Sequence, residues 1–270
     1  MPARYRPTLI STDSIEQLPV IYRDQHLVAI NKPSGLLVHR SPIDKHETRF
    51  ALQLLRDQIG QRVYPVHRLD KPTSGVLLFA LSPDIAREIS LQFATQQVLK
   101  SYLAVVRGWC PEQGVIDHAL QDKPDKIADR DRTQLRPAKE AVTHYRRLAT
   151  VEIPYAVDRY PQSRYSLLTL QPEHGRKHQL RRHMKHLGYP IIGDAKHGKG
   201  VHNRFFDKQY SCGRLLLACT AMDITHPVSG ETVSLRADLD AAFHRVLAAF
   251  AWEEALQYEF VAEMAEILPA

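Results

Sequence analysis

The sequence predicts a globular protein that combines buried strands with amphipathic helices, and three observations support this prediction. Of the 270 residues, 44% are hydrophobic and 24% are charged, which is ordinary for a soluble globular chain. Short apolar runs such as residues 76–81 predict buried strands. Apolar residues at helical spacing, as in residues 48–59, predict helices that pack one face on a core. A chain of this length can bury a full core.

The predicted elements begin after a polar, irregular stretch, residues 1–18, which we expect to form a loose arm. Residues 21–30 predict two strands around a turn, and residues 32–35 predict a second turn that acts as scaffold. Residues 111–139 are rich in Asp, Lys and Arg and predict an exposed polar insertion. The remaining predictions are helices at 48–59, 83–93 (with Ser82 as N-cap), 176–187 and 240–256, strands at 76–81, 98–108, 141–152 and 164–170, and a hairpin turn at 225–231.

One stretch, residues 66–79, places a carboxylate on a turn that leads into a buried strand. Gly75 allows a backbone conformation that other residues resist, which predicts a tight turn. Asp70 is flanked by Arg68 and Lys71, and nearby cations favour the charged form of a carboxylate. An ionised carboxylate in a cleft is a candidate nucleophile or electrostatic stabiliser. From these residues alone, an aspartate that only opens a turn explains the pattern about equally well.

A second stretch, residues 174–188, concentrates positive charge without any acidic residue. On the predicted helix, its N-terminus attracts an anion. Its histidines have the spacing of metal ligands, but ligand histidines rarely lie among so many cations. Phosphate or carboxylate binding therefore explains the pattern better than a metal site or a solvated basic face. The residues predicted to share one side of the helix are His178, Arg181, Arg182 and Lys185, and the cations that precede them are Arg176 and Lys177.

Composition also narrows the setting in which the protein acts. The net charge of +6 suits a polyanionic partner. The three cysteines include no Cys-x-x-Cys pair, so we expect neither a disulfide framework nor a cysteine zinc site. No apolar stretch approaches the roughly 18–20 residues of a membrane span, and the chain does not begin with a signal-peptide core. We expect a cytoplasmic protein without membrane contact, and no obligatory protein partner is evident.

Four separate stretches resemble motifs of the RluA-type pseudouridine synthases. This family has His-Arg-Leu-Asp followed by Ser/Thr-Ser-Gly and an apolar strand, which residues 67–79 resemble. Residues 100–104 resemble the family's Lys-x-Tyr-x-Ala, residues 175–183 its Gly-Arg-x-His-Gln-Leu-Arg-x-His, and residues 188–194 its Gly-x-Pro-Ile-x-Gly-Asp. The resemblance implies an α+β pseudouridine synthase fold, with a mostly antiparallel, bent mixed sheet and with flanking helices and loops around a central cleft. It also implies one catalytic domain over residues 19–270, without a preceding S4-like RNA-binding module.

The resemblance implies a role for each matching residue. Asp70 corresponds to the catalytic aspartate, Tyr102 to a tyrosine that lies against the target base and takes part in proton removal, and Arg181 to the partner of Asp70. Without the resemblance, a tyrosine in an apolar strand is usually a core residue with a satisfied hydroxyl. The residues expected to bind the RNA substrate are Arg68, which helps to displace the uridine, Leu217, which packs under the uracil, and Arg176, Lys177, His178, Arg182 and Lys185.

The implied activity is the isomerisation of uridine to pseudouridine, in which the target base first leaves its helix. Asp70 then attacks the nucleoside or assists glycosidic cleavage, and neither a metal nor a redox cofactor is expected. Residues 142–197 are especially similar to family members that modify uridine 65 of tRNA, so tRNA is the expected substrate. Enzymes that act on ribosomal RNA or on another tRNA site share the catalytic residues and remain alternatives. A non-catalytic RNA-binding protein has no need of Asp70 together with Tyr102 and Arg181.

Overall fold

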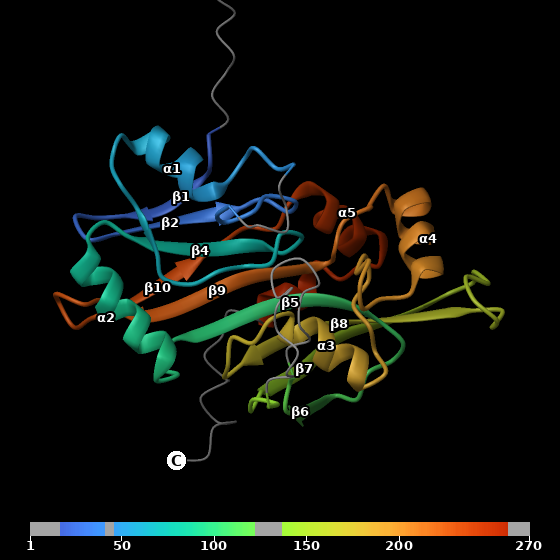
Figure 1. Ribbon diagram of the computed structural model, residues 1–270. Coiled ribbons are helices and arrows are strands. Elements are labelled where there is room, and N and C mark those ends of the chain that lie inside the picture. Colours follow the sequence, from blue (N-terminus) through green and yellow to red (C-terminus); the bar gives the residue numbers. More distant parts are fainter. Residues whose placement is uncertain (1–16, 41–45, 122–136, 259–270) are drawn as a thin grey trace, which may run out of the picture.

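The computed structural model describes residues 17–40, 46–121 and 137–258 (Figure 1). The first elements are β1 (Val20–Arg23), β2 (Leu27–Lys32), α1 (Ala51–Ile59), β3 (Tyr64–Pro65), β4 (Ser74–Ala80), α2 (Pro83–Ala94), β5 (Leu99–Arg107) and β6 (Gln113–Asp117). The later elements are β7 (Val142–Ile153), β8 (Ser163–Pro172), α3 (Gln179–His186), α4 (Gly200–Tyr210), β9 (Leu217–Thr225), β10 (Thr232–Arg236), α5 (Ala241–Ala249) and the 3-10 helix η1 (Glu254–Tyr258). The arm predicted at 1–18 lies almost wholly outside the described residues, as does part of the insertion predicted at 111–139.

The strands of the described residues form one ten-stranded sheet, in the order β1-β2-β4-β9-β5-β8-β7-β6 (Figure 1). The short strands β3 and β10 pair with β4 and β9, respectively. All paired strands are antiparallel except β4 and β9, which are parallel. The predicted α+β class with a mixed, mostly antiparallel sheet is therefore confirmed. No helix within the described residues is long and apolar enough to span a membrane.

The parallel pairing of β4 and β9 depends on one glycine. The two strands pair only at Ser74 with Ala218 and at Gly75 with Cys219. Gly75 has a φ of +108°, and a Cβ at this position would lie 2.0 Å from the carbonyl oxygen of Cys219. Because only glycine permits both the conformation and this approach, the turn predicted around Gly75 joins the two halves of the sheet. It also fixes where the chain carrying Asp70 meets the sheet.

Three apolar clusters hold the helices on the sheet. The first packs α1 and α2 on β2 and β4 through residues such as Leu55 and Ile89. The second packs α4 and α5 on β5 and β8 through Phe206 and Phe243. The third, which includes Met184, anchors α3 beside β5, β8 and the start of β9. The Asp70 turn and α3 are thus anchored in different clusters, and the site between them forms only when both have packed.

Several predicted elements are confirmed with small shifts at their ends. The strands predicted at 21–30, 76–81, 98–108, 141–152 and 164–170 correspond to β1 with β2, β4, β5, β7 and β8. In α2, Ser82 Oγ accepts the backbone N–H of Ile85 at 3.3 Å, so the predicted N-cap is also confirmed. The helix predicted at 48–59 begins at Ala51, and its C-cap is Gly60 in the left-handed conformation.

Four elements differ from the prediction, each for a local reason. The helix predicted at 176–187 begins only at Gln179, because His178 has left-handed backbone angles (φ 55°, ψ 30°). The helix predicted at 240–256 ends at Ala249, and the positive φ of Ala251 (54°) redirects the chain so that Trp252 packs in the core. The insertion predicted at 111–139 contains strand β6, an edge strand whose only buried residue is Ile116. Helix α4 was not predicted, since it buries only His202 and Phe206 and shows little periodicity.

Candidate active site

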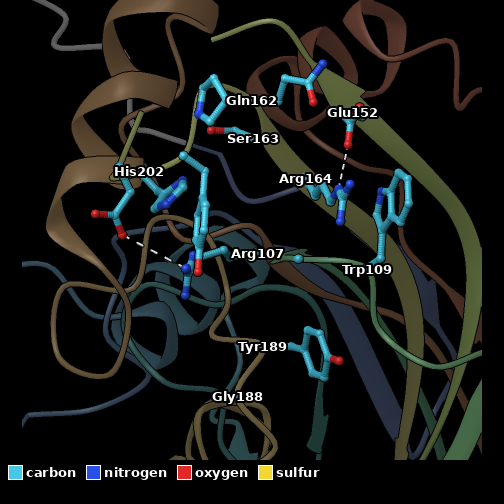
Figure 2. Close-up of a pocket in the computed structure, with 13 residues that line it drawn as sticks. Arg107, Trp109, Glu152, Gln162, Ser163, Arg164, Gly188, Tyr189 and His202 are labelled. Atoms are coloured by element: carbon cyan, nitrogen blue, oxygen red, sulfur yellow. Dashed lines mark hydrogen bonds and ion pairs between the residues drawn. The ribbon is translucent and has the colours of Figure 1, made fainter. Parts of the chain in front are cut away.

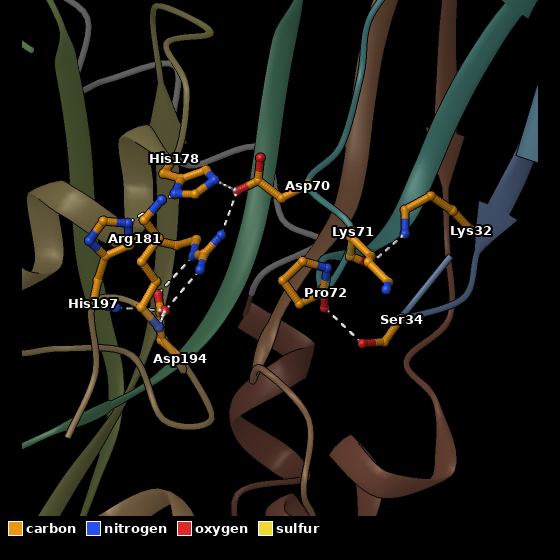
Figure 3. Close-up of polar contacts among 10 residues, drawn as sticks. Lys32, Ser34, Asp70, Lys71, Pro72, His178, Arg181, Asp194 and His197 are labelled. Atoms are coloured by element: carbon orange, nitrogen blue, oxygen red, sulfur yellow. Dashed lines mark hydrogen bonds and ion pairs between the residues drawn. The ribbon is translucent and has the colours of Figure 1, made fainter. Parts of the chain in front are cut away.

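The side chains of Asp70 and Arg181 meet in a cleft between the turn before β4 and helix α3 (Figure 3). Arg181 Nη1 donates a hydrogen bond to Asp70 Oδ2 at 3.0 Å, although the two residues are 111 positions apart in the chain. Only 6% of the Arg181 side chain and 19% of the Asp70 side chain are exposed. The contact expected for this pair is therefore present, and it is largely shielded from solvent.

Asp194 binds the other side of the Arg181 guanidinium, which was not predicted from the sequence. Its Oδ2 and Oδ1 accept hydrogen bonds from Arg181 Nε at 2.7 Å and Nη2 at 2.8 Å. Oδ1 also accepts the backbone N–H groups of Lys196 and His197, each at 2.9 Å. Burial opposes the charge of Asp194, but Arg181 and these N–H groups outweigh it and hold the pKa of Asp194 below its usual range. The sequence signal was its place at the end of the 188–194 motif, which does not reveal its partner.

Arg181 thus bridges two carboxylates from different parts of the chain. Burial opposes its charge, but the hydrogen bonds and charges of Asp194 and Asp70 raise the pKa of Arg181 above its ordinary value. Bidentate pairing with Asp194 fixes the plane of the guanidinium, so that Nη1 is held in position for Asp70. This arrangement orients the Asp70 carboxylate before any substrate binds.

His178 is the second group beside Asp70. Its Nε2 lies 3.9 Å from Asp70 Oδ2, and its Nδ1 forms a hydrogen bond with His197 Nε2 at 2.9 Å. Burial lowers the pKa of His178 to about 4 even though the Asp70 charge acts in the opposite direction, so the ring is neutral at pH 7. A left-handed conformation is uncommon for a residue other than glycine and is often found at functional sites.

Tyr102 and Leu217 lie with Asp70 and Arg181 around one small cavity of about 90 Å³. The register of the sheet explains this. Cys219 of β9 pairs with Tyr102 of β5 on one side and with Gly75 of β4 on the other, and Leu217 is two positions before Cys219. Burial raises the pKa of Tyr102 well above its usual value, and Cys219 and the Asp70 carboxylate act in the same direction. The Tyr102 hydroxyl is therefore neutral at physiological pH and can donate a hydrogen bond.

The predicted RNA-binding residues divide between this cavity and a basic pocket beside it. Arg68, Arg176, His178 and Leu217 line the cavity. The basic pocket has a volume of about 570 Å³, and its cationic lining residues are Lys177, Arg182, Lys185 and Lys196. His178 lines both, so the cavity opens directly onto the basic surface.

The two cations that flank Asp70 in the sequence, Arg68 and Lys71, form no ion pair with it within the described residues. Lys71 Nζ pairs with Glu47 Oε1 at 2.6 Å rather than with Asp70. Arg68 lines the cavity, but among the residues that the structure describes the cation paired with Asp70 is Arg181, and the His178 ring that lies 3.9 Å from Asp70 Oδ2 is neutral. The cation that matters most for Asp70 therefore comes from α3 and not from its own turn.

Lys32 supports the Asp70 turn from beneath and was not a predicted site residue (Figure 3). It is fully buried, and its Nζ donates to the backbone carbonyl oxygens of Pro33 at 2.8 Å, Leu36 at 2.9 Å and Lys71 at 3.2 Å. Burial and the charge of Arg214 lower the pKa of Lys32 to about 7, although Asp70 opposes this shift. The turn predicted at 32–35 is therefore scaffold for the Asp70 turn, as expected, and Lys32 is the residue that joins the two.

Hydrogen bonds within the protein hold His174, His178 and His183 of the basic stretch. His183 is fully buried between the Thr143 hydroxyl (Nδ1 to Oγ1, 2.9 Å) and the His118 carbonyl oxygen, to which its Nε2 donates at 3.0 Å. The parts of the chain that the structure describes contain no group of three or more His, Cys, Asp or Glu side chains placed to hold a metal ion. His183 therefore joins α3 to β7 and contributes to the position of Arg181.

Asp70, paired with the buried Arg181 and next to Tyr102, thus lies beside a basic pocket that suits a polyanionic ligand. A family model described as RNA pseudouridylate synthase matches residues 26–186. The chain therefore belongs to the RNA pseudouridylate synthase family.

Curated bacterial proteins named tRNA pseudouridine synthase C are similar over most of this chain. The protein from Vibrio cholerae is 52% identical over 239 residues, which cover 88% of this chain and 98% of that protein. The protein from Vibrio parahaemolyticus is 49% identical over 240 residues, with 89% and 98% covered. The protein from Pectobacterium carotovorum is 52% identical over 249 residues, which cover 92% of this chain but only 66% of that longer protein.

Two solved human structures have the same fold. The human RNA pseudouridylate synthase domain containing 4 aligns with a TM-score of 0.64 and 27% identity, covering 86% of this chain and 93% of its own. The human RNA pseudouridylate synthase domain containing 1 also has a TM-score of 0.64, with 24% identity and 88% of this chain covered. The expected pseudouridine synthase fold is therefore confirmed.

Proposed function

We propose that this protein converts uridine to pseudouridine in tRNA, with uridine 65 as its target. The observation that carries the proposal is the contact between Arg181 and Asp70 in a cavity that Tyr102 also lines. Membership of the pseudouridylate synthase family supports the reaction. The names of the curated relatives, about half identical to this chain, support tRNA as the substrate. The similarity of residues 142–197 to enzymes that modify uridine 65 supports the position.

In the proposed reaction, Asp70 acts on a uridine that has left its helix. The bond between the ribose C1′ and the uracil N1 breaks, the uracil turns, and C1′ bonds to C5, which then loses its proton while N1 gains one. Asp70 either attacks the nucleoside or assists the cleavage, and both steps need an ionised and oriented carboxylate. Arg181 supplies the orientation, and Asp194 holds Arg181. Asp194 is a positioning residue, because its hydrogen bonds are to Arg181 and to backbone N–H groups.

Tyr102 acts on the base in this proposal through its ring and through its hydroxyl. The ring offers a surface on which uracil can stack above Leu217. Since burial keeps the hydroxyl protonated, Tyr102 can take the C5 proton only if its own proton passes to another group. The Asp70 carboxylate, which lines the same cavity as Tyr102, is the acceptor that we propose for this relay.

RNA binding in this proposal opens the cleft and offsets the cost of extruding the base. The cavity around Asp70 has a volume of about 90 Å³, which is below the roughly 300–1,000 Å³ of a small-molecule site. A nucleotide therefore enters only when lining side chains such as Arg68 move. Extrusion of a base from a helix costs a few kcal/mol. Phosphate contacts from Lys177, Arg182 and Lys185 in the adjoining basic pocket offset this cost.

The test is to incubate the pure protein with an unmodified tRNA transcript, and separately with unmodified ribosomal RNA, and to map pseudouridine at every position. We expect one modified nucleotide, at position 65. A transcript with cytidine at position 65 is the matched control and should remain unmodified. Modification at another tRNA position would contradict the target, and modification of ribosomal RNA alone would contradict the substrate. No pseudouridine in either RNA would contradict the reaction.

A further inference from the structure

Another pocket, separate from the cavity around Asp70 and from the basic pocket, opens on the surface at the ends of β5 and α3 (Figure 2). The proposed reaction does not use it. Its volume is about 590 Å³, within the range of sites that bind small molecules or nucleotides. We call it the aromatic pocket, and the lining residues that define it are Arg107, Trp109, Tyr160, Arg164, Tyr189 and His202.

Two elements of the fold connect the aromatic pocket to the catalytic cleft. Tyr102, in the cleft, and Arg107, in the pocket, are five residues apart on β5, a distance of about 17 Å at the rise of a strand. His178 and Tyr189 flank α3 at its two ends, and a helix of 8 residues is about 12 Å long. The two sites are therefore separate, yet one RNA molecule can reach both.

Aromatic rings and arginines are stacked on one another in and around the pocket, where they remain accessible. Trp109 is 44% exposed and Tyr160 is 53% exposed, which is unusual for such large apolar rings. The Arg164 guanidinium lies 4.2 Å from the centre of the Trp109 ring, and that of Arg159 lies 4.9 Å from the Tyr160 ring (Figure 2 shows the first pair). Unpaired nucleobases stack on surfaces of this kind, made of aromatic rings and guanidinium planes.

The charges around the aromatic pocket suit a ligand that carries phosphate. Asp158 is within ion-pair distance of Arg107 (3.9 Å) and of Lys199 (3.6 Å), and Glu152 pairs with Arg164. With Arg159 on Tyr160, four cationic side chains surround these two carboxylates. The excess is positive, so a phosphate at the rim is attracted while the acidic groups hold the arginines in place.

His202 gives the wall of the pocket an unpaired polar atom. The residue is 3% exposed, and its Nδ1 forms a hydrogen bond of 2.9 Å with the Tyr165 hydroxyl. Its Nε2 is buried and has no hydrogen-bond partner among the described residues. Burial lowers the pKa of His202 to about 4, so the ring is neutral at pH 7. Buried polar atoms are nearly always hydrogen-bonded, so a water molecule or an atom of a ligand supplies this partner.

We propose that the aromatic pocket binds one unpaired nucleotide of the RNA substrate, outside the catalytic cleft. The base stacks on the Trp109–Arg164 and Tyr160 surfaces, a phosphate lies near the excess cations, and His202 lies in the wall beside the base. The inference rests on the proposed function only in taking RNA as the ligand. It adds a site that holds the RNA at a second point while the target uridine is in the cleft.

The first test uses Trp109 as its own reporter. The chain has two tryptophans, and Trp252, at 3% exposed, is in the core. We expect a single-stranded RNA hexamer to quench the fluorescence of Trp109, and a duplex of the same sequence to quench it far less. Trp109→Phe should lose the response, and Arg164→Ala should weaken the apparent affinity about tenfold. Quenching that is absent, or equally strong with the duplex, would overturn the proposal.

The second test uses full-length tRNA and a matched control. Tyr160→Ala removes an exposed ring, so we expect the variant to fold and to raise the KM for tRNA roughly tenfold, with the loss in KM rather than in kcat. The control is Arg62→Ala, which removes a similar arginine–tyrosine stack (5.0 Å, on Tyr64) outside the pocket. Equal KM values for the two variants would overturn the proposal.

The two proposals can fail independently. The hexamer assay requires no turnover, so it can also be run on Asp70→Asn protein. If the hexamer quenches the fluorescence of that variant and the wild type forms no pseudouridine, the proposed reaction is contradicted and the proposal for the aromatic pocket is retained. Pseudouridine formation without quenching would do the reverse.

Discussion

The catalytic cleft and the aromatic pocket differ most in how their polar groups are satisfied. In the cleft, each of Arg181 Nε, Nη1 and Nη2 donates to a carboxylate, and Asp194 accepts four hydrogen bonds. In the pocket, His202 Nε2 has no partner among the described residues, and the Trp109 and Tyr160 rings are open to solvent. The cleft is thus organised before substrate arrives, as chemistry requires, whereas the pocket is completed by what it binds.

Size gives the same contrast. The cleft holds about 90 Å³ and the aromatic pocket about 590 Å³. A nucleotide must displace side chains to enter the first but can enter the second directly. This comparison predicts that changes in the cleft act on rate and on folding, while changes on open surfaces act on affinity. The predictions that follow test it, from the largest expected effect to the smallest, with Lys185→Ala given beside Arg181→Ala as its control.

The largest effect is expected for Asp70→Asn, which keeps the shape of the side chain and removes its charge. Pseudouridine formation should fall below detection, and tRNA binding should survive, because the phosphate contacts lie on other residues. The measurement is product formation by the pure variant, with affinity from filter binding. Measurable turnover would show that Asp70 does not have the role assigned to it.

Arg181→Ala should reduce both rate and stability. The change leaves Asp194 buried without its main cation, and removing one partner of a buried pair costs about 3–5 kcal/mol. It also frees Asp70 from its 3.0 Å contact. Single-turnover rates at saturating tRNA should therefore collapse even when they are corrected for the folded fraction of the protein. Urea unfolding measures the loss of stability and gives that fraction.

Lys185→Ala is the control on the same helix, because its exposed side chain lines the basic pocket and not the cleft. It should weaken tRNA binding and lower the salt slope by about one unit, with little change in the saturated rate. Similar rate losses for Lys185→Ala and Arg181→Ala would mean that α3 acts only as an electrostatic surface.

Tyr102→Phe should leave tRNA affinity nearly unchanged and slow the single-turnover rate about 100-fold or more, the usual contribution of positioned proton transfer. The ring and its stacking surface remain, and only the hydroxyl of the proposed relay is lost. Rates at saturating tRNA, with stability checked by thermal unfolding, decide the outcome. A wild-type rate would remove the hydroxyl from the mechanism and leave stacking as the role of Tyr102.

The smallest effect concerns a property that the two regions share, a neutral buried histidine. Burial lowers the pKa of His178 and of His202 to about 4, whereas a histidine in the unfolded chain titrates near about 6.5. Between these pH values the unfolded chain binds more protons, so stability is fully present above pH 6.5 and falls as the pH drops toward 4. Urea unfolding at several pH values should show this slope, and His178→Gln or His202→Gln should each reduce it by about one proton. An unchanged slope in either variant would mean that its histidine is not buried in neutral form.

The sequence by itself determined what depends on neighbouring residues. A run of buried apolar residues specified β4, a serine three residues before Ile85 specified the start of α2, and a glycine specified the turn behind Asp70. These signals act over three or four positions, which is the range of strand alternation and of helix capping. The motifs also predicted Asp70, Tyr102 and Arg181 as site residues, and the structure places all three around one cavity.

The start of α3 shows where such local signals end. Nothing in residues 176–178 prevents a helix, yet the helix begins at Gln179. The Gln179 side chain donates to the Val142 carbonyl oxygen on β7 at 2.8 Å and accepts the backbone N–H of Arg176 at 3.0 Å. Contact with a distant strand therefore sets the boundary and turns His178 toward Asp70.

Apart from the Asp70–Arg181 pair, which the family resemblance implied, only the tertiary structure decided which charges meet. Asp194 pairs with Arg181, and Lys71 with Glu47 instead of Asp70, since ion pairs depend on distance in space and the sheet order sets that distance. The aromatic pocket is a stronger case, because its rings come from the segment after β5, the loop before β8, the segment after α3 and helix α4, while Arg164 comes from β8. No short stretch of sequence contains that pocket. It exists because antiparallel β5 and β8 bring Arg107 opposite Tyr165, one residue after Arg164.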